Sequence, residues 1–429
     1  MTQIGFAYNL KPESDAPSPE RDAGATLADD EPPSRRRDIG SRTEATLTAQ
    51  GRHALPSPPD SPGAGASFAP DDEFAEWDSE TTIAAVEDAL SVLGDVIRLE
   101  ANDDFPERLR AARPDIVFNI AEGLRGPNRE AHVPAFCEFF GVPYSASDPL
   151  TLSLCLDKAR TKEVLSHHRV PTASFVVVRS EADIEKLVRR VRRSTLGTRP
   201  SAARGRVPMS LPLFVKPLHE GSSKGITDQN LCRTAEALES QVSFLLTRYE
   251  QPVLVEEYLP GAEFTCAVLG NGAGARVLPL VGMNFAALPD GAAPVYSYEA
   301  KWLWDRPENP LQIFECPARI DEALEGRITS VVLDAYRVLG CRDWSRIDVR
   351  LDAAGVPNVV EVNPLPGILP DPADNSCFPK AARAAGMSYD ELIQVCLRCA
   401  AERQGVSLPQ ATVPRGARRW VPVGAAALG

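Results

Sequence analysis

The chain has 429 residues, which is too long for one compact core and predicts two or three domains. Its net charge of -13 argues against a general nucleic-acid-binding protein, because neutralising phosphates requires clustered Lys and Arg. No apolar run approaches the ~20 residues needed to cross a bilayer, and the N-terminus lacks the features of a secretion signal. Nine irregularly spaced cysteines favour reduced thiols. We therefore expect a cytoplasmic protein that binds neither nucleic acid nor membranes.

The first 150 residues are predicted to form an open α/β lobe. Residues 4–9 have the pattern of a short buried strand, and the proline-rich stretch 12–70 that of a disordered or surface insertion. Apolar residues at helical spacing predict a helix over 79–93. Strands are expected at 96–99 and 115–119, so that strands and helices alternate.

The remaining elements are also expected in chain order. Residues 149–170 are predicted as one helix, followed by strands at 174–178, 213–216 and 251–257, with a basic surface loop over 192–210. Residues 263–269 and 275–281 are predicted to pair as a hairpin. Helices are expected at 320–339 and 389–401, where Cys396 and Cys399 are interpreted as packing thiols, and a mobile tail follows from 406.

Residues 340–367, GCRDWSRIDVRLDAAGVPNVVEVNPLPG, carry the clearest chemical signal. Two β-rich runs are predicted to fold together across a turn at 356–358. Alternation along a strand sends Glu361 and Asn363 to one face, where Asp348 of the preceding run joins them. Three oxygen ligands without histidine or cysteine favour Mg²⁺ that holds a phosphate.

A second signal is a strand that ends in Lys216 and runs into a Gly/Ser-rich loop, FVKPLHEGSSKGI. Backbone N–H groups and the hydroxyls of Ser222 and Ser223 can donate to phosphate oxygens there, although the spacing is not that of a P-loop. About thirty residues later, VLVEEYLPGAEF offers Glu263 for a ribose and backbone groups for an adenine edge.

Together and in this order, these segments resemble the ATP-grasp superfamily and, within it, the D-alanine–D-alanine ligase family. The resemblance also includes CLDKARTK, VLVEEYLPGAEFTCAVLGN and YSYEAKW. It implies an α/β (α+β) fold of three domains, at 1–150, 151–256 and 257–405, with ATP between the central and C-terminal domains. The implied reaction is ATP-dependent carboxylate–amine ligation through an acylphosphate, on small amino-acid or carboxylic-acid substrates, by a homodimer.

The resemblance also implies roles for individual residues. ATP would contact Lys158, Lys216, Glu256, Tyr258, Leu259 and Glu263, with Lys301 near the γ-phosphate. Asp348, Glu361 and Asn363 would bind two Mg²⁺ ions, or Mn²⁺. Arg346 and the backbone N–H of Gly367 would stabilise an oxyanion, because fixed donors favour charge that develops during reaction. A salt bridge to a neighbouring carboxylate is the alternative for Arg346.

Four departures from the family pattern concern the substrates. The insertion interrupts the position of a substrate-orienting glutamate, which leaves Glu76 or Asp78 as candidates, or as helix-start carboxylates. A histidine-containing loop is replaced by one in which Glu122, Arg129 and Glu130 are the polar groups. There Arg129 is expected to pair a substrate carboxylate, or else to belong to a salt-bridged loop.

The other two departures lie nearer the C-terminus. Trp302 stands where the family has tyrosine, and a Trp donates one hydrogen bond and accepts none. An insertion after Gly367 places Ser376 where a hydroxyl would bind the second substrate's carboxylate, unless Ser376 is a helix N-cap. These changes leave two alternatives open: an ester-forming ligase with a hydroxyl acceptor, and a non-catalytic nucleotide-binding protein.

Overall fold

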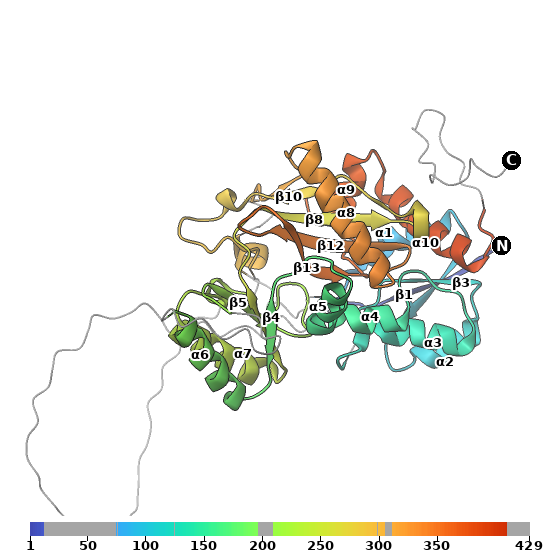
Figure 1. Ribbon diagram of the computed structural model, residues 1–429. Coiled ribbons are helices and arrows are strands. Elements are labelled where there is room, and N and C mark those ends of the chain that lie inside the picture. Colours follow the sequence, from blue (N-terminus) through green and yellow to red (C-terminus); the bar gives the residue numbers. More distant parts are fainter. Residues whose placement is uncertain are drawn as a thin grey trace, which may run out of the picture. The chain divides into compact units, whose positions relative to one another are not determined.

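The computed structural model describes residues 1–12, 74, 76–123, 125–195, 209–297, 299–304 and 311–409 (Figure 1). The predicted insertion at 12–70 lies outside this range except for Pro12, as do most of the loop predicted at 192–210 and the tail after 409. Met1–Lys11 and the chain from Asp72 onward form one compact unit that contains three sheets.

The first sheet is parallel and belongs to the N-terminal lobe. Its order is β2–β1–β3, from Asp95–Glu100, Gln3–Tyr8 and Ile116–Asn119. The strands alternate with α1 (Glu80–Ser91), α2 (Phe105–Ala112) and α3 (His132–Phe140). Ser79 begins α1 because its hydroxyl accepts a hydrogen bond from the backbone N–H of Thr82. The predicted open α/β layer is confirmed.

The helix predicted over 149–170 is two helices, α4 (Pro149–Leu156) and α5 (Lys158–His167). Asp157 separates them, because its backbone leaves the helical region and its carboxylate accepts from the N–H groups of Ala159 and Arg160, both at 3.0 Å. An aspartate inside an apolar helical pattern thus acts as an N-cap. The break places Lys158 in the first turn of α5.

The second sheet is antiparallel, with the order β4–β7–β5–β6. Its strands are Phe175–Val178, Val253–Glu257, Leu213–Pro217 and Leu231–Cys232, and α6 (Glu181–Thr195) and α7 (Ala235–Tyr249) pack on it. The core between them contains aliphatic residues such as Val188, Val215 and Leu238. Lys216 is the fourth residue of β5, so its position follows from the register with β7.

The third sheet contains β11–β10–β8–β12–β13, with β9 paired to β8. Their bounds are Phe314–Glu315, Val281–Met283, Glu263–Leu269, Trp344–Leu351, Pro357–Asn363 and Arg276–Val277. The predicted hairpin is confirmed, although its second arm is split into β9 and β10. The three sheets fall within the ranges predicted for the three domains, except that β7 ends at Glu257; the domain boundaries themselves stay a prediction.

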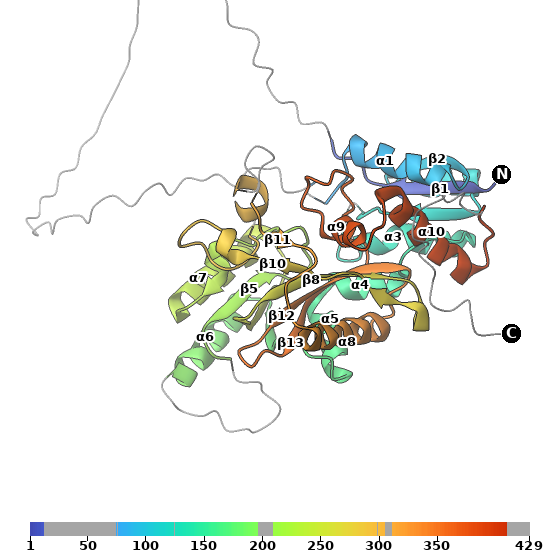
Figure 2. The ribbon, with the colours of Figure 1, turned by 90° about the horizontal axis from the view of Figure 1, so that it is seen from above.

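Strand alternation in β12 separates a packing face from a functional face. Ile347 and Val349 pack with α8 (Glu322–Val338), whereas Trp344 lies on the other face and contacts Phe378 of α9 (Cys377–Ala384) with ring centroids 5.5 Å apart. Figure 2 shows α8 and α9 on the two sides of this sheet. Arg346 and Asp348 share the face of Trp344 by alternation.

The turn between β12 and β13 was predicted at 356–358, and that prediction is wrong. The chain reverses over 352–356, where the backbone N–H of Asp352 donates to the carbonyl of Val356 at 3.0 Å and Gly355 has φ +75°. Glycine suits this left-handed conformation, whereas Pro357 already begins β13. The last long helix is α10 (Tyr389–Gln404), in which Cys396 and Cys399 pack as buried free thiols, as predicted.

Candidate active site

A cavity of about 310 Å³ is lined by strands of the second and third sheets and by residues of the N-terminal lobe that lie outside its strands. It gathers residues that are up to about three hundred positions apart in the chain. The predicted site residues that line it are Glu76, Glu122, Glu130, Lys158, Lys216, Ser222, Ser223, Glu256, Tyr258, Leu259, Glu263, Lys301, Arg346, Asp348, Glu361, Asn363, Gly367 and Ser376. Arg129 does not line the cavity, and the side chain of Trp302 lies outside the described part of the structure.

The three predicted metal ligands converge on β12 and β13. Asp348 lies directly opposite Glu361, and a β-bulge beside this pair leaves Val360 without a partner in β12. Nδ2 of Asn363 donates to Oδ2 of Asp348 at 3.4 Å, while Oδ1 of Asp348 is buried without a hydrogen-bond partner among the described residues. Burial raises the pKa of Asp348. An unpaired buried carboxylate oxygen beside two further oxygen ligands fits a hard divalent cation.

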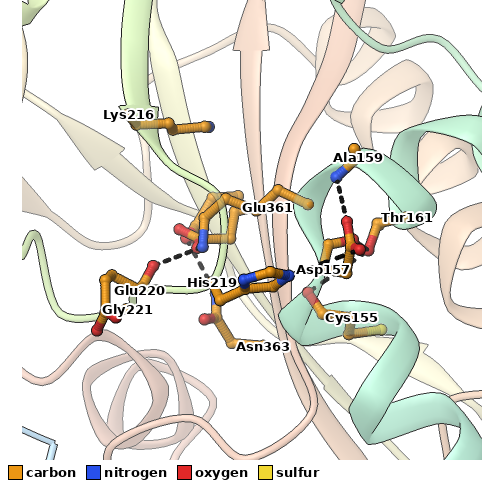
Figure 3. A network of polar contacts seen from close by, with 12 residues as sticks. Cys155, Asp157, Ala159, Thr161, Lys216, His219, Glu220, Gly221, Glu361 and Asn363 are labelled. Atoms are coloured by element: carbon orange, nitrogen blue, oxygen red, sulfur yellow. Dashed lines mark hydrogen bonds and ion pairs between the residues drawn. The ribbon is translucent and has the colours of Figure 1, made fainter. Parts of the chain in front are cut away.

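Lys158 of α5 pairs with Glu361, which belongs with Asn363 and Glu220 to the network of polar residues in Figure 3. Its ammonium lies 3.0 Å from Oε1 of Glu361 and donates to the carbonyl of Glu220 at 2.5 Å. Burial works to raise the pKa of Glu361, but the charges of Lys158 and Lys216 outweigh it and lower that pKa. The break at Asp157 is therefore what brings a cation to the acidic end of β13.

Arg346 of β12 and Gly367, which follows β13 in the chain, both line the cavity. Nη2 of Arg346 donates to Oδ2 of Asp348 at 3.1 Å, so the salt bridge considered from the sequence exists. Its Nε, however, is buried without a partner among the described residues. The guanidinium therefore retains a donor for another group.

Ser376 is at the N-terminus of α9 but makes no capping hydrogen bond. Its hydroxyl donates to the carbonyl of Gly367 at 3.0 Å and accepts from the N–H of Leu369 at 3.2 Å. Ser376 is therefore the N-cap residue of α9 by position, as the alternative predicted, but its side chain does not cap the helix. Ser376 instead holds the loop that carries Gly367 in a fixed conformation.

A buried ion triad lines the part of the cavity next to the second sheet. Glu256 of β7 lies 2.8 Å from the ammonium groups of both Lys216 and Lys162, and all three side chains are less than a tenth exposed. Burial works to raise the pKa of Glu256, but the two lysines outweigh it and lower that pKa to about 2. Lys162 was missed from the sequence, although it follows Lys158 by four residues and so shares its face of α5.

Arg350 is a second residue that the sequence analysis missed. Its Nη1 donates to Oε2 of Glu263 and its Nη2 to the hydroxyl of Tyr258, both at 2.9 Å. The guanidinium also lies over the rings of Tyr258 and Phe285, at 4.9 and 5.1 Å from their centroids. Arg350 follows Arg346 and Asp348 at alternate positions of β12, so strand alternation could have predicted that it shares their face.

The Gly/Ser-rich loop is held against the N-terminal lobe by Glu76. The N–H of Gly221 donates to Oε1 of Glu76 at 2.9 Å, and a Cβ at Gly221 would lie only 2.5 Å from that oxygen. Glycine is therefore needed for the close approach. Ser222 and Ser223 have φ of 50° and 61°, and the hydroxyl of Ser223 donates to the carbonyl of Tyr296 at 3.1 Å.

Arg129 pairs with Glu76 rather than pointing into the cavity. Its Nη2 donates to both oxygens of Glu76, at 3.3 and 2.9 Å, and its Nη1 to the carbonyl of His219 at 3.1 Å. This geometry favours the alternative of a salt-bridged loop. Neither Glu76 nor Asp78 caps α1, and Asp78, whose pKa burial raises to about 7, does not line the cavity.

Comparison with known proteins agrees with this geometry. The family model described as D-ala D-ala ligase C-terminus matches residues 170–398. An uncharacterized protein of Sinorhizobium fredii is 36% identical over 67% of this chain and 75% of its own length. The D-alanine–D-alanine ligase of Actinobacillus pleuropneumoniae serotype 5b is 34% identical over 74% of this chain and 91% of its own.

The chain belongs to the D-alanine–D-alanine ligase family. Its ATP-grasp fold is confirmed by the crystal structure of the D-alanine–D-alanine ligase from Bacillus anthracis complexed with ATP. That structure aligns with a TM-score of 0.55 at 20% identity, over 76% of this chain and 94% of the other. No helix among the described residues is long and apolar enough to cross a membrane.

In this member of the family, Lys301 lies in a π-helical segment, Glu299–Trp304, at the edge of the cavity. Burial and the nearby charge of Arg346 lower the pKa of its ammonium to about 8. At neutral pH the pKa of this amine is therefore close to the pH of the solution. The charge of Lys301 is sensitive to the charge of any ligand that binds near Arg346, the predicted oxyanion group.

Proposed function

We propose that this protein is an ATP-dependent ligase that joins the carboxyl group of one amino acid to the amino group of another. The observation that carries the proposal is the gathering in one cavity of the acidic pair Asp348 and Glu361, the lysines at 158 and 216, and Arg346. A phosphoryl transfer followed by acyl transfer needs these groups together.

The nucleotide would lie between the second and third sheets. Glu256 would accept from the adenine amino group, with Tyr258 and Leu259 beside the base and Glu263 on the ribose. Support comes from the low pKa of Glu256, which keeps it an acceptor. Arg350 holds Glu263 and Tyr258 in place.

Asp348, Glu361 and Asn363 would hold Mg²⁺, and Mn²⁺ suits the same oxygens. When bound, the metal neutralises charge on the transferring phosphoryl group. Lys158, Lys216 and Lys301 supply the protein's own positive charge to the same region, and the Gly/Ser-rich loop presents its backbone N–H groups and the hydroxyls of Ser222 and Ser223.

In the proposed reaction, a substrate carboxylate oxygen attacks the γ-phosphorus of ATP, and the bond to ADP breaks. The acyl carbon of the resulting acylphosphate is then attacked by the second substrate's amine. The tetrahedral oxyanion would be stabilised by Arg346 and by the N–H of Gly367, and its collapse expels phosphate as the amine loses a proton. Ser376 maintains the Gly367 loop for this step.

The test is release of ADP and phosphate from MgATP with single and paired amino acids, beginning with D-alanine, and with mass detection of the product. We expect amino-acid-dependent release and a dipeptide. Asp348→Asn serves as the inactive control. Release that is no greater with amino acids than without them would refute the proposal.

Assembly and location stay predictions. Light scattering after size-exclusion chromatography measures whether the chain is the predicted homodimer. The nine cysteines are all free in the structure, which supports a reducing compartment such as the cytoplasm.

A further inference from the structure

The wall of the cavity next to the N-terminal lobe carries more carboxylates than cations. Its four glutamates are Glu76, Glu122, Glu130 and Glu220. The two nearby cations, Arg129 and Lys224, are already used, because each lies within 4.0 Å of both Glu76 and Glu220. These four side chains form a neutral cluster. Glu122 and Glu130 form no ion pair with these or other described residues.

Glu130 is the clearer member of this remaining pair. It is 8% exposed, lines the cavity, and has no hydrogen bond or ion pair among the described residues. Lys158 acts on it electrostatically, but that ammonium is bonded to Glu361 and to the carbonyl of Glu220. A buried carboxylate that faces a cavity without a partner is costly unless a ligand satisfies it.

Glu122 is the second member of the pair, and its side chain is half-buried. It lines the cavity and has no hydrogen bond or ion pair among the residues that the structure describes. Burial and the charge of Glu130 raise its pKa, while burial and the charge of Glu76 raise that of Glu130 to about 8. Two neighbouring carboxylates that resist ionisation together indicate a site prepared for positive charge.

The position of this pair identifies which substrate it faces. Glu130 interacts electrostatically with Lys158 and Glu361, at the predicted phosphate and metal site. Glu122 interacts in the same way with Lys301. The amino acid bound there is the one whose carboxylate attacks ATP. Because that carboxylate would face the γ-phosphate, the glutamates are available for the ammonium groups of the same molecule.

We propose that the activated substrate is a diamino acid, and that Glu122 and Glu130 receive its two ammonium groups. This inference rests on the proposed ligase function. An ordinary amino acid brings one ammonium and leaves the second carboxylate to take a proton from water. A diamino acid compensates both charges, so its transition state is bound more tightly than that of a neutral isostere.

The decisive experiment uses the full chain with MgATP and pairs each test amino acid with alanine, in D and L forms. Neutral 2-aminobutyrate and norleucine are compared with 2,4-diaminobutyrate and lysine by ADP release. We expect kcat/KM for a diamino acid to exceed that of its neutral counterpart by about tenfold or more. Tandem mass spectrometry of the product should place the diamino acid at the N-terminal position, since its carboxyl group is the one activated.

Variants locate the effect. Glu130→Gln and Glu122→Gln should each reduce the preference for the diamino acid about tenfold without changing KM for ATP. Glu107→Gln, a matched change on the exposed surface of α2, should leave the preference unchanged. A purely structural role would instead lower the rates for charged and neutral substrates equally.

The outcomes separate the two proposals. Release of ADP that is equal or faster with neutral amino acids would overturn the diamino-acid inference and leave the ligase function standing. Appearance of the diamino acid only at the C-terminal position of the product would likewise overturn the inference alone. Absence of release with every amino acid would overturn the ligase function, and the inference with it.

Discussion

The buried triad of Glu256, Lys162 and Lys216 makes the strongest prediction about stability. Glu256→Gln keeps the size of the side chain but removes the charge between two ammonium groups, each 2.8 Å away. Lowering the pKa of Glu256 from 4.5 to about 2 corresponds to about 3 kcal/mol of stabilisation of its charged form. Breaking a buried ion pair at one partner costs about 3–5 kcal/mol, which agrees.

The sign of the pH dependence follows from the direction of this shift. A carboxyl group whose pKa is lower in the folded state stabilises that state above its unfolded pKa of about 4.5. The contribution is lost as the pH falls from there toward 2. Glu256→Gln should therefore lower the free energy of unfolding by about 3 kcal/mol at pH 7 and reduce the loss of stability between pH 5 and 2.

Chemical denaturation monitored by fluorescence at pH 7 and at pH 3 measures both effects. Glu257→Gln is the matched control, because Glu257 is the next residue of β7 and is exposed. We expect the free energies of unfolding of the two variants to differ by about 3 kcal/mol at pH 7 and by less than half as much at pH 3. Equal stability of the two variants at pH 7 would refute the reasoning, since it would mean that the triad contributes nothing.

Four further predictions concern catalysis and nucleotide binding. Asp348→Asn should abolish ADP release while circular dichroism and the melting temperature stay close to those of the wild type; an active variant would remove Asp348 from the metal site. Arg346→Ala should lower kcat by about 100-fold or more with little change in KM for ATP, as expected for a donor used in the transition state; the opposite split would overturn the oxyanion role. The pKa of Lys301 is about 8 in the free protein, so kcat/KM for ATP should fall as the pH rises through 8 and the ammonium loses its charge. That limb should be absent in Lys301→Met if any activity remains, and an unchanged profile would contradict the assignment. Arg350→Met should raise KM for ATP several-fold while kcat changes little, because Glu263 and Tyr258 lose the group that positions them; an unchanged KM would show that they need no such support.

Local sequence patterns were sufficient to predict which residues lie together wherever neighbours in the sequence are also neighbours in space. Asp348, Glu361 and Asn363 were brought together by strand alternation and a short turn, and the register of β12 with β13 confirms it. The turn itself was misplaced because a proline-containing tripeptide was preferred to the preceding glycine. Gly355, with its positive φ, determines the reversal. The helices α4 and α5 were predicted as one helix for a similar reason. The side chain of Asp157 competes for backbone N–H groups and ends the first helix, and this was not considered.

The sequence by itself determined the fold class and the family, through the resemblance of several segments in order, and the Gly/Ser-rich loop and the acidic face of β12 and β13, because each of these depends on residues close together in the chain. Tertiary structure decided which charges meet. Glu76 reaches Gly221 across 145 positions, and Lys162 reaches Glu256 from a helix to a strand of another segment. The tertiary structure likewise pairs Arg129 with Glu76, whereas Glu122 and Glu130 form no ion pair in the part of the chain that the structure describes. The energy of a buried charge depends on every neighbour at once, and a linear pattern does not contain that information.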